Sequence, residues 1–379
     1  MIKVSSIIIT LSALAATAAY GQVRAPNLKA GAVYVLTNQT ANSVIAFARR
    51  PDGALVFVDN EPTQGTGSPV AIPPDPPTDA LASQGSLSID EDGEYLYAVN
   101  AISDDITTLE ITPSGLEFVG KVSSQGSRPI STTVYNEVLY VLNEGNIPNI
   151  SGFGVAEDGS LTPIPGSTQL LAGGALADPA QIGFSPDGKW LVVTEKMGNR
   201  IDVYPVDDNG VAGPGIATSS AGMTPFGFAF SGPGGLFVSE AFGATPRRGA
   251  LSSYLIESLT TGLLMNVSPS IPNLQTASCW VVTTNCGRNI FVSNTGSGTI
   301  SSYHSGKGAT VQIGATLVAG TGPASAPIDM AVSDTGNYLY VVESGLHTVG
   351  AFRIGVDSSL SKIGDFGALP VGAQGIVAR

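Results

Sequence analysis

Short apolar runs that end in a polar residue repeat along this chain. In the clearest copy, Tyr338–Val342 has no polar position, Glu343 ends the run, and a second apolar run follows at Thr348–Phe352. A run of β-branched and aromatic residues without polar positions is typical of a strand covered on both faces. The two runs with the loop between them predict a pair of antiparallel strands.

The same unit occurs seven times, at steps of roughly 50 residues. The aligned anchor residues are Tyr34, Tyr97, Tyr140, Val192, Phe237, Phe291 and Tyr340. The third residue after each anchor is polar: Thr37, Asn100, Asn143, Glu195, Glu240, Asn294 and Glu343. A repeat of this length built from strands alone predicts an all-β fold, a seven-bladed β-propeller of four-stranded antiparallel blades.

The two ends of the chain are predicted to share one blade. Gly31–Asn38, Ser43–Phe47 and Ala54–Val58 supply three strands of the first blade, and no inner strand precedes them. Gln374–Ala378 matches Pro327–Val332, the segment that opens the last blade. We therefore expect the C-terminal strand to pair with the N-terminal blade and close the ring, which removes an open sheet edge.

One long segment falls outside the repeat. Glu61–Gln84 contains prolines at 62, 69, 73, 74, 76 and 77 and has no periodicity, which predicts an irregular loop over one end of the channel. Two interpretations of this loop stay open: a passive surface loop, and a lid or partner-docking loop.

Composition changes this picture in two ways. The 47 glycines and 25 prolines among 379 residues favour many short strands and turns. Residues 1–21, with one lysine, an apolar run and small residues before Gln22, resemble a secretory signal peptide, so we expect a secreted, extracellular propeller over residues 22–379. No other stretch approaches membrane-spanning length, so no membrane association is expected.

The net charge of −13 argues against nucleic acid, anionic lipid and doubly charged phosphate substrates as partners. A monomer with a small-molecule or glycan ligand is expected. Cys279 and Cys286 are too far apart along an extended strand to bridge, so both thiols are expected to be unpaired. The sequons at Asn38, Asn149 and Asn266 would carry glycans if the source is eukaryotic.

The repeats resemble the seven-bladed propeller lactonase family, which includes bacterial 6-phosphogluconolactonase and fungal carboxymuconate cyclase. The resemblance covers nearly all of residues 31–379. It rests on the strand ends of the Tyr-Val-x-Asn type, the Ser-Pro-Asp-Gly turn at 185–188, and segments such as those starting at Asn294 and Ala326. It implies a seven-bladed ring with a small-molecule site at the channel mouth.

The chain departs from that family at the inner strands. Family members with the presumed lactonase machinery carry His and Arg where these strands begin. This chain has Asp178-Pro179-Ala180-Gln181 and Thr224-Pro225-Phe226-Gly227 at the matching positions. The family mechanism is therefore not carried over intact.

The candidate site is expected at the edge where second strands end and inner strands begin, because antiparallel pairing brings these ends together. Glu195, Glu240 and Glu343 are candidate bases whose crowding would raise their pKa, and His347 is a candidate acid or base. Alternatively, the glutamates tie down the backbone amides of loops or are solvated, and His347 is a loop histidine without a chemical role. The candidate substrate-binding residues are Asn100, Asn143, Arg200, Arg248, Trp280, Asn294 and Asp329. Lys196 and Arg247 are further cations placed to reach the mouth, and Trp280 either stacks on a ring substrate or wedges two blades.

Three functions follow from these residues. The first is a secreted enzyme of the lactonase or cyclase type, a hydrolase or isomerase acting on a neutral or weakly anionic lactone at the channel mouth. The second is a non-catalytic extracellular propeller that binds a glycan, small molecule or protein. The third is a divalent-cation site built from the same oxygens, although no Asp-x-Asp-x-Asp-Gly loop or His cluster supports it, so no cofactor and no metal ligands are predicted.

Overall fold

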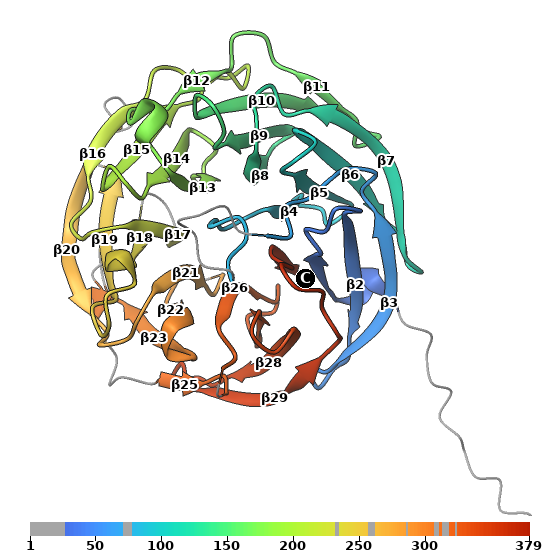
Figure 1. The fold of residues 1–379 in the computed structure, drawn as a ribbon, viewed down its shortest axis with the longest axis vertical. Helices are drawn as coiled ribbons and strands as arrows, with labels where there is room; N and C mark the ends of the chain where they lie inside the picture. The colour runs from blue at the N-terminus through green and yellow to red at the C-terminus, as the bar shows by residue number, and fades with distance from the viewer. Residues whose placement is uncertain are drawn as a thin grey trace, which may run out of the picture.

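Seven β-sheets stand around a common axis in the computed structural model of this chain (Figure 1). The structure describes residues 27–70, 78–231, 235–256, 262–285, 287–306, 311–312, 318–322 and 324–379. In these ranges the chain is all-β apart from four 3₁₀ turns, η1 (Leu28–Ala30), η2 (Gly174–Leu176), η3 (Phe242–Ala244) and η4 (Thr295–Ser297). The predicted seven-bladed propeller is confirmed.

Each blade is an antiparallel sheet whose strands run in chain order from the axis outwards, with blade 1 as the exception. Blade 2 contains β4 (Leu87–Ile89), β5 (Tyr95–Asn100), β6 (Asp105–Ile111) and β7 (Leu116–Ser123). Blade 3 contains β8 (Pro129–Tyr135), β9 (Val138–Asn143), β10 (Asn149–Val155), β11 (Leu161–Pro163) and β12 (Gln169–Leu170). Blade 4 contains β13 (Pro179–Phe184), β14 (Trp190–Glu195), β15 (Arg200–Pro205) and β16 (Ile216–Ser219).

The remaining blades repeat this order. Blade 5 contains β17 (Pro225–Ser231), β18 (Gly235–Glu240), β19 (Ala250–Ile256) and β20 (Leu264–Pro272). Blade 6 contains β21 (Ser278–Thr283), β22 (Asn289–Asn294), β23 (Thr299–Ser305), β24 (Val311–Gln312) and β25 (Val318–Gly320). Blade 7 contains β26 (Pro327–Val332), β27 (Tyr338–Glu343), β28 (Thr348–Ile354) and β29 (Leu360–Phe366). In blades 3 and 6 the outer position is shared by two short strands, both paired with the third strand.

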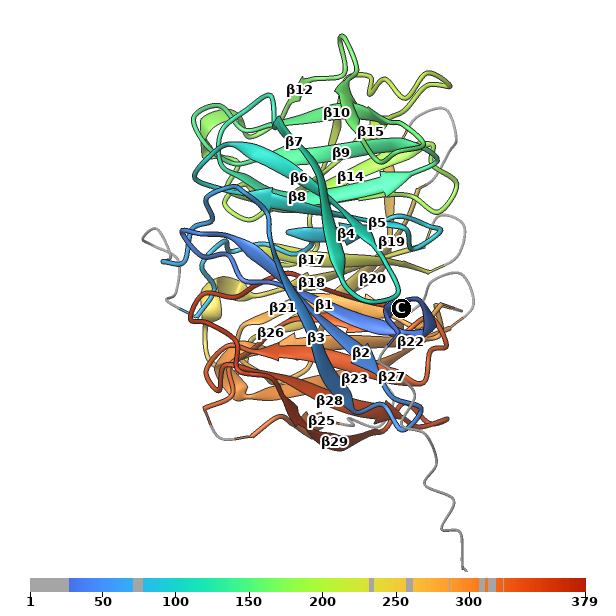
Figure 2. The same cartoon turned by 90° about the vertical axis from the view of Figure 1, so that its right-hand side faces the viewer.

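Blade 1 joins the two ends of the chain, as predicted. Its order from outside to inside is β3 (Leu55–Pro62), β2 (Ser43–Arg49), β1 (Ala32–Leu36) and β30 (Ile376–Ala378). Val35 pairs with Ile376 and Val33 with Ala378 across the closure. Seen from the side, the outer strands β3 and β7 of neighbouring blades lie next to each other (Figure 2).

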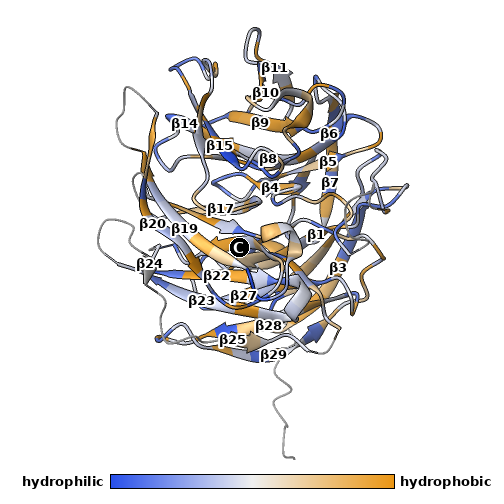
Figure 3. Cartoon of the chain, turned by 60° about the vertical axis from the view of Figure 1, so that its left-hand side comes forward, coloured by the Kyte–Doolittle hydropathy of each residue, from blue (hydrophilic) through white to orange (hydrophobic). Residues whose placement is uncertain are grey.

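The core lies between the blades, which explains the unbroken apolar runs. The second strands β14, β18 and β27 are buried at every position, whereas the outer strand β29 is half exposed. The seven anchor residues of the repeat are all fully buried: Tyr34, Tyr97, Tyr140, Val192, Phe237, Phe291 and Tyr340. Figure 3 shows the hydrophobic colouring along strands such as β9 and β28 and hydrophilic colouring on many loops. A second strand faces a neighbouring blade on each side, so neither face is left to solvent.

Part of the long proline-rich loop crosses the channel. Residues 78–86, here called the central segment, precede the inner strand β4 and are almost entirely buried. Gln84 donates through its amide nitrogen to the carbonyl of Val281 at 2.8 Å and accepts from the Val281 N–H at 3.0 Å. Gln374 donates to the Ser83 carbonyl at 2.7 Å from the opposite side of the ring. The loop prediction is therefore correct for this part, and the segment fills the channel as well as covering it; residues 71–77 lie outside the described residues.

Two further predictions concern single residues. Cys279 is buried and carries a free thiol, while Cys286 lies outside the described residues. Asn38 is fully buried and donates to the Ser68 carbonyl at 2.7 Å, and Asn149 is also buried, so neither has room for a glycan in the folded chain. Asn266 is exposed on β20. Among the described ranges, no helix has the length and apolar character of a membrane span.

Candidate functional site

A cavity of about 630 Å³ opens at the predicted end of the channel, between blades 4, 5 and 6 and the central segment. Its walls come from two kinds of position that repeat in each blade. One is the residue after a second strand: Lys196, Ala241 and Thr295. The other is the residue before an inner strand: Asp178, Thr224, Ala277 and Ala326. The volume lies within the range of small-molecule sites.

The backbone at these inner-strand starts is bent in a way that turns side chains towards the mouth. Asp178, Thr224, Ala277 and Ala326 all have positive φ, between 43° and 57°. A register shift follows within the first residues of β13, β17, β21 and β26. Positive φ at residues other than glycine and bulges in strands both recur next to functional sites, where they re-aim side chains.

A buried cation lies at the centre of the polar wall. The ammonium group of Lys196, which is 7% exposed, lies 3.0 Å from Asp178 Oδ1 and donates to the Ala82 carbonyl of the central segment at 2.8 Å. A second carboxylate, Asp79, lines the same cavity and is also buried. One ammonium and two carboxylates therefore share this site, with Lys196 and Asp79 buried and Asp178 one-third exposed.

The opposite wall is apolar and aromatic. The rings of Phe226 and Trp280 lie 4.9 Å apart, and Lys196 Nζ lies 5.5 Å from the Phe226 ring centre. Trp280 donates through Nε1 to the Ser83 carbonyl at 2.9 Å, so it wedges the central segment against blade 6 and also faces the cavity. Burial raises the pKa of the Cys279 thiol beside it, so this cysteine is a protonated apolar wall group and not a thiolate nucleophile.

Glu195, Glu240 and Glu343 are fully buried and do not line the cavity. Glu195 accepts from the Gly173 N–H at 2.9 Å, and Glu240 accepts from the Ser270 hydroxyl. Burial raises the pKa of Glu195 and of Glu343 to about 7, and raises the pKa of Glu240. The prediction that these side chains converge on the mouth is wrong, because successive residues of a strand point to opposite faces and the next residue reaches the cavity instead.

Thr194 shows this alternation within β14. Its hydroxyl donates to the Phe226 carbonyl of blade 5 at 2.5 Å, whereas Glu195 contacts Gly173 on the blade 3 side. Lys196 has the parity of Thr194 and therefore faces Phe226 and the cavity. The alternative interpretation, that the glutamates tie down loop amides, describes the contact of Glu195 with the Gly173 N–H. Glu240 instead accepts from the Ser270 hydroxyl, and Glu343 forms an ion pair with Lys362 of β29 at 3.2 Å. Their catalytic role stays a prediction.

The predicted asparagines bind groups of the neighbouring blade. All three are fully buried: Asn100, Asn143 and Asn294. Asn100 accepts from the Thr63 hydroxyl at 2.7 Å and Asn294 accepts from the Asn273 amide at 3.0 Å, and in both cases the partner lies in the preceding blade or its connection. These amides bind protein and are not open to a substrate in the cavity.

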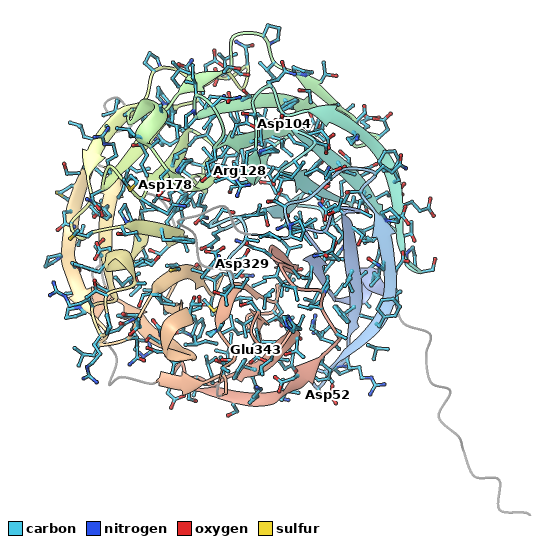
Figure 4. All side chains as sticks on the ribbon, viewed as in Figure 1. Asp52, Asp104, Arg128, Asp178, Asp329 and Glu343 are labelled. Atoms are coloured by element: carbon cyan, nitrogen blue, oxygen red, sulfur yellow. The ribbon has the colours of Figure 1, made fainter. Side chains whose placement is uncertain are left out.

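Asp329 lies at the axis of the ring, while Glu343 lies farther out in blade 7 (Figure 4). The Asp329 carboxylate is buried, accepts from the Met330 N–H at 2.9 Å, and does not line the cavity. Burial raises its pKa to about 8, and the nearby Asp79 carboxylate adds to this shift. This aspartate is therefore a protonated group of the channel interior at neutral pH.

The other predicted residues divide between mouth and surface. Trp280 is at the cavity, as expected. Arg200 is part-exposed and lies 3.7 Å from Glu195 Oε2, Arg248 is exposed and lies over the Phe242 ring, and His347 is exposed in the loop after Glu343. None of these three lines the cavity. Position along the chain alone therefore overestimates their reach.

Two charged residues near the mouth escaped the sequence prediction. Asp79 is in the aperiodic loop, where no pattern marks it. Arg128 forms an ion pair with Glu144 at 2.5 Å and donates to the Ala80 carbonyl at 3.2 Å, so it holds the central segment from blade 3. The sequence does contain a signal for Arg128. A proline opens the inner strand in four blades, and the residue before it occupies the same position in each repeat: Arg128, Asp178, Thr224 and Ala326.

Within the part of the chain that the structure describes, no group of three or more His, Cys, Asp or Glu side chains is arranged to hold a metal ion. The chemical groups that line the cavity are an ammonium, carboxylates, hydroxyls and an aromatic wall.

The fold and cavity define a seven-bladed β-propeller with a small-molecule-sized site at one mouth. No protein-family model and no curated protein matches the chain. Among solved structures, a putative 6-phosphogluconolactonase from Bacteroides uniformis superposes with a TM-score of 0.68 at 18% identity, over 91% of this chain and 99% of that one. The periplasmic gluconolactonase PpgL of Pseudomonas aeruginosa gives 0.71 at 14%, over 92% and 98%.

A second Bacteroides protein of the same description, from Bacteroides fragilis, gives a TM-score of 0.69 at 14% identity, over 92% and 98% of the two chains. The predicted resemblance to lactonase propellers is thus confirmed for the fold. Identity at this level carries no residue roles, since one fold supports many functions.

Proposed function

We propose that this chain is a lactonase-type hydrolase that opens a neutral or weakly anionic lactone in the cavity between blades 4, 5 and 6. The observation that carries the proposal is the buried Lys196 ammonium, 3.0 Å from Asp178 and facing an apolar wall of Phe226 and Trp280. A lactone has a carbonyl that such a cation polarises and a ring that such a wall covers.

The roles follow from the groups on each wall. The lactone ring packs against Trp280 and Phe226, and its carbonyl oxygen accepts a hydrogen bond from Lys196 Nζ. Asp178, whose side chain is one-third exposed, takes a proton from a water that attacks the carbonyl carbon. The acyl–oxygen bond then breaks, the ring oxygen takes up the proton, and the product is a hydroxy acid.

The charge balance of the site selects the substrate. Lys196 is already paired with one carboxylate, a second carboxylate lines the cavity, and the whole chain carries a net charge of −13. A doubly charged phosphate ester would be repelled by this arrangement, so the 6-phosphate of the Bacteroides proteins' named substrate is not expected to fit. The apolar wall favours a lactone with a hydrophobic body.

The site of action that we propose is extracellular, on the evidence of the leader-like sequence of residues 1–21.

The experiment is turnover of a panel of neutral, hydroxylated and phosphorylated lactones, followed by acid release at constant pH. Lys196→Met and Asp178→Asn are expected to lower kcat/KM by about a hundredfold, because each removes charge from the transition state. Lys189→Met is the matched control, since Lys189 lies at the opposite end of the same blade and is exposed.

Glu240→Gln completes the set. If the cavity is the active site, this variant keeps the wild-type rate, because Glu240 is buried within blade 5, bonds to Ser270 and does not line the cavity. A hundredfold loss in Glu240→Gln with no loss in Lys196→Met would move the chemistry to the glutamate ring. Calorimetric binding of a lactone or glycan without turnover would support the non-catalytic alternative instead.

A further inference from the structure

A second cavity, of about 460 Å³, lies between blades 2 and 3 at the opposite end of the ring from the site described above. We call it the blade 2–3 cleft. Its lining includes six carboxylates from three turns: Asp90, Glu91, Asp92, Glu94, Glu137 and Glu157. Asp90 is used locally, because it accepts from the N–H groups of Glu94 and Tyr95 at 2.7 and 3.0 Å.

The cations of the described residues leave most of this charge unbalanced. Lys29 pairs with Glu94 at 2.7 Å, and Arg379 donates to the Gly93 carbonyl next to it. No ion pair of the described residues involves Glu91, Glu137 or Glu157, and all three side chains are exposed. The uncompensated charges therefore surround the cleft on several sides.

A buried hydroxyl in the same cleft lacks a partner. Tyr97 lines the cleft, is fully buried, and its hydroxyl has no hydrogen-bond partner among the described residues. The junction of blades 7 and 1 has the same residues at the same repeat positions. There Tyr338 and Tyr340 donate to the Pro51 and Gly53 carbonyls at 2.6 and 3.0 Å.

In the blade 2–3 junction the first of these two bonds is kept and the second is lost. Tyr95 donates to the Glu157 carbonyl at 3.1 Å, as Tyr338 does to Pro51. Tyr97 does not reach the turn, and the cleft opens at this place. A buried polar group without a partner is costly and points to a missing ligand.

The junction of blades 1 and 2 allows a comparison. Tyr34, the equivalent of Tyr97, also lacks a hydrogen-bond partner; burial raises the pKa of its hydroxyl, and the positive charge of Arg379 reduces this shift. Arg379 reaches from there to Gly93, in the β4–β5 turn of the next blade. Among the described residues that line the blade 2–3 cleft there are six carboxylates and no lysine or arginine.

We propose that the blade 2–3 cleft binds an aliphatic polyamine, whose ammonium groups pair with Glu91, Glu137 and Glu157 above the buried Tyr97 hydroxyl. The methylene chain lies along the Tyr95 ring and the Val155 side chain, which form the apolar part of the lining. A metal ion fits less well, because the described carboxylates form no group close enough to hold one. This site is separate from the proposed lactone site, and its test does not depend on whether the chain hydrolyses lactones.

The test is isothermal titration calorimetry of the whole protein with spermidine at low ionic strength. One-to-one binding is expected, and Glu91→Gln and Glu137→Gln should each weaken it about fivefold, the effect of losing one exposed ion pair. Tyr97→Phe should weaken binding about threefold, the effect of losing one hydrogen bond, without lowering the melting temperature, because the hydroxyl has no partner in the free protein. A merely structural tyrosine would not separate binding from stability in this way.

Asp334→Asn is the matched control, since Asp334 occupies the position of Glu91 in the equivalent turn of blade 7 and is exposed. If Asp334→Asn and Glu91→Gln weakened spermidine binding equally, the binding would reflect general attraction by an acidic surface, and the proposal would be overturned. Absence of spermidine binding would overturn it too. Titrations with tetralysine and with calcium chloride are run in parallel, and binding of either one without spermidine would assign the cleft to a basic peptide or to a metal ion instead.

Discussion

Buried carboxyl groups are the most unusual residues of this ring. Glu195, Glu240, Glu343 and Asp329 are all 0–2% exposed, and burial raises the pKa of each. Such a group is protonated in the folded chain at a pH where it is ionised in the unfolded chain. In this state a carboxyl can donate as well as accept, which suits a junction between two blades.

Asp329 makes stability depend on pH. Its pKa is about 8 in the folded chain against 3.8 normally, so between these values the unfolded chain binds fewer protons and the free energy of unfolding falls as pH rises. We expect a loss on the order of a few kcal/mol between pH 4 and pH 8, after which this group adds no further slope. Urea denaturation at pH 5, 6.5 and 8 measures this change in the free energy of unfolding.

Asp329→Asn removes this group and should abolish the fall in stability between pH 7 and pH 8, whereas Glu195 and Glu343, whose pKa values are about 7, keep a slope below pH 7. Asp334→Asn, an exposed change in the same blade, should keep the wild-type profile. If Asp329→Asn also kept it, the aspartate would be ionised in the folded chain.

At the scale of elements, the central segment connects blades that are distant in sequence. Gln84 bonds to Val281 of blade 6, its N–H donates to the Ala180 carbonyl of blade 4 at 3.0 Å, and Ser131 of blade 3 donates to its carbonyl at 2.6 Å. The segment thus has the role of a fixed plug, and Ala82 and Asp79 within it form one side of the cavity. Its lack of periodicity is consistent with this role, because the segment bonds to several blades instead of pairing along one strand.

Gln84→Ala should therefore destabilise the protein by about 1–3 kcal/mol, since it leaves the buried Val281 N–H and carbonyl without their partner. The denaturation midpoint in urea measures this cost. Gln64→Ala is the control, because the Gln64 side chain is exposed and makes no hydrogen bond in the structure. Equal midpoints for the two variants would show that the plug contributes nothing to stability.

At the scale of the whole molecule, closure of the ring depends on three residue pairs between β1 and β30. The same terminal segment holds the plug, because Gln374 accepts from the Leu81 N–H at 3.0 Å and donates to Ser83. Closure and plugging of the channel are thus coupled through the last six residues.

Deleting residues 374–379 is expected to cost more than 3 kcal/mol, because it exposes the edge of β1 and frees the central segment. Ile376→Val, which keeps the strand, should cost about 1 kcal/mol. Thermal and urea melts of the two variants provide the comparison. A deletion variant as stable as Ile376→Val would show that the blade 1 closure is not a major source of stability.

The sequence determined the number of blades, the strand positions and the shared terminal blade. This was possible because the second strands are covered on both faces, so burial left an unbroken apolar signature at Tyr34, Tyr340 and the other anchors. It also indicated the end of the channel at which the cavity opens, since strand ends such as Glu195 and starts such as Asp178 meet there.

The tertiary structure decided which side chains form the site. Whether Glu195 or Lys196 faces the cavity depends on the parity of the last strand residue, and a bulge of one residue reverses it. The place of Asp79 in the cavity wall depends on how the central segment crosses the channel, which no local pattern records. Strand periodicity is a local property and can be read from the sequence. The contacts that form the site join different blades and exist only after the blades have packed.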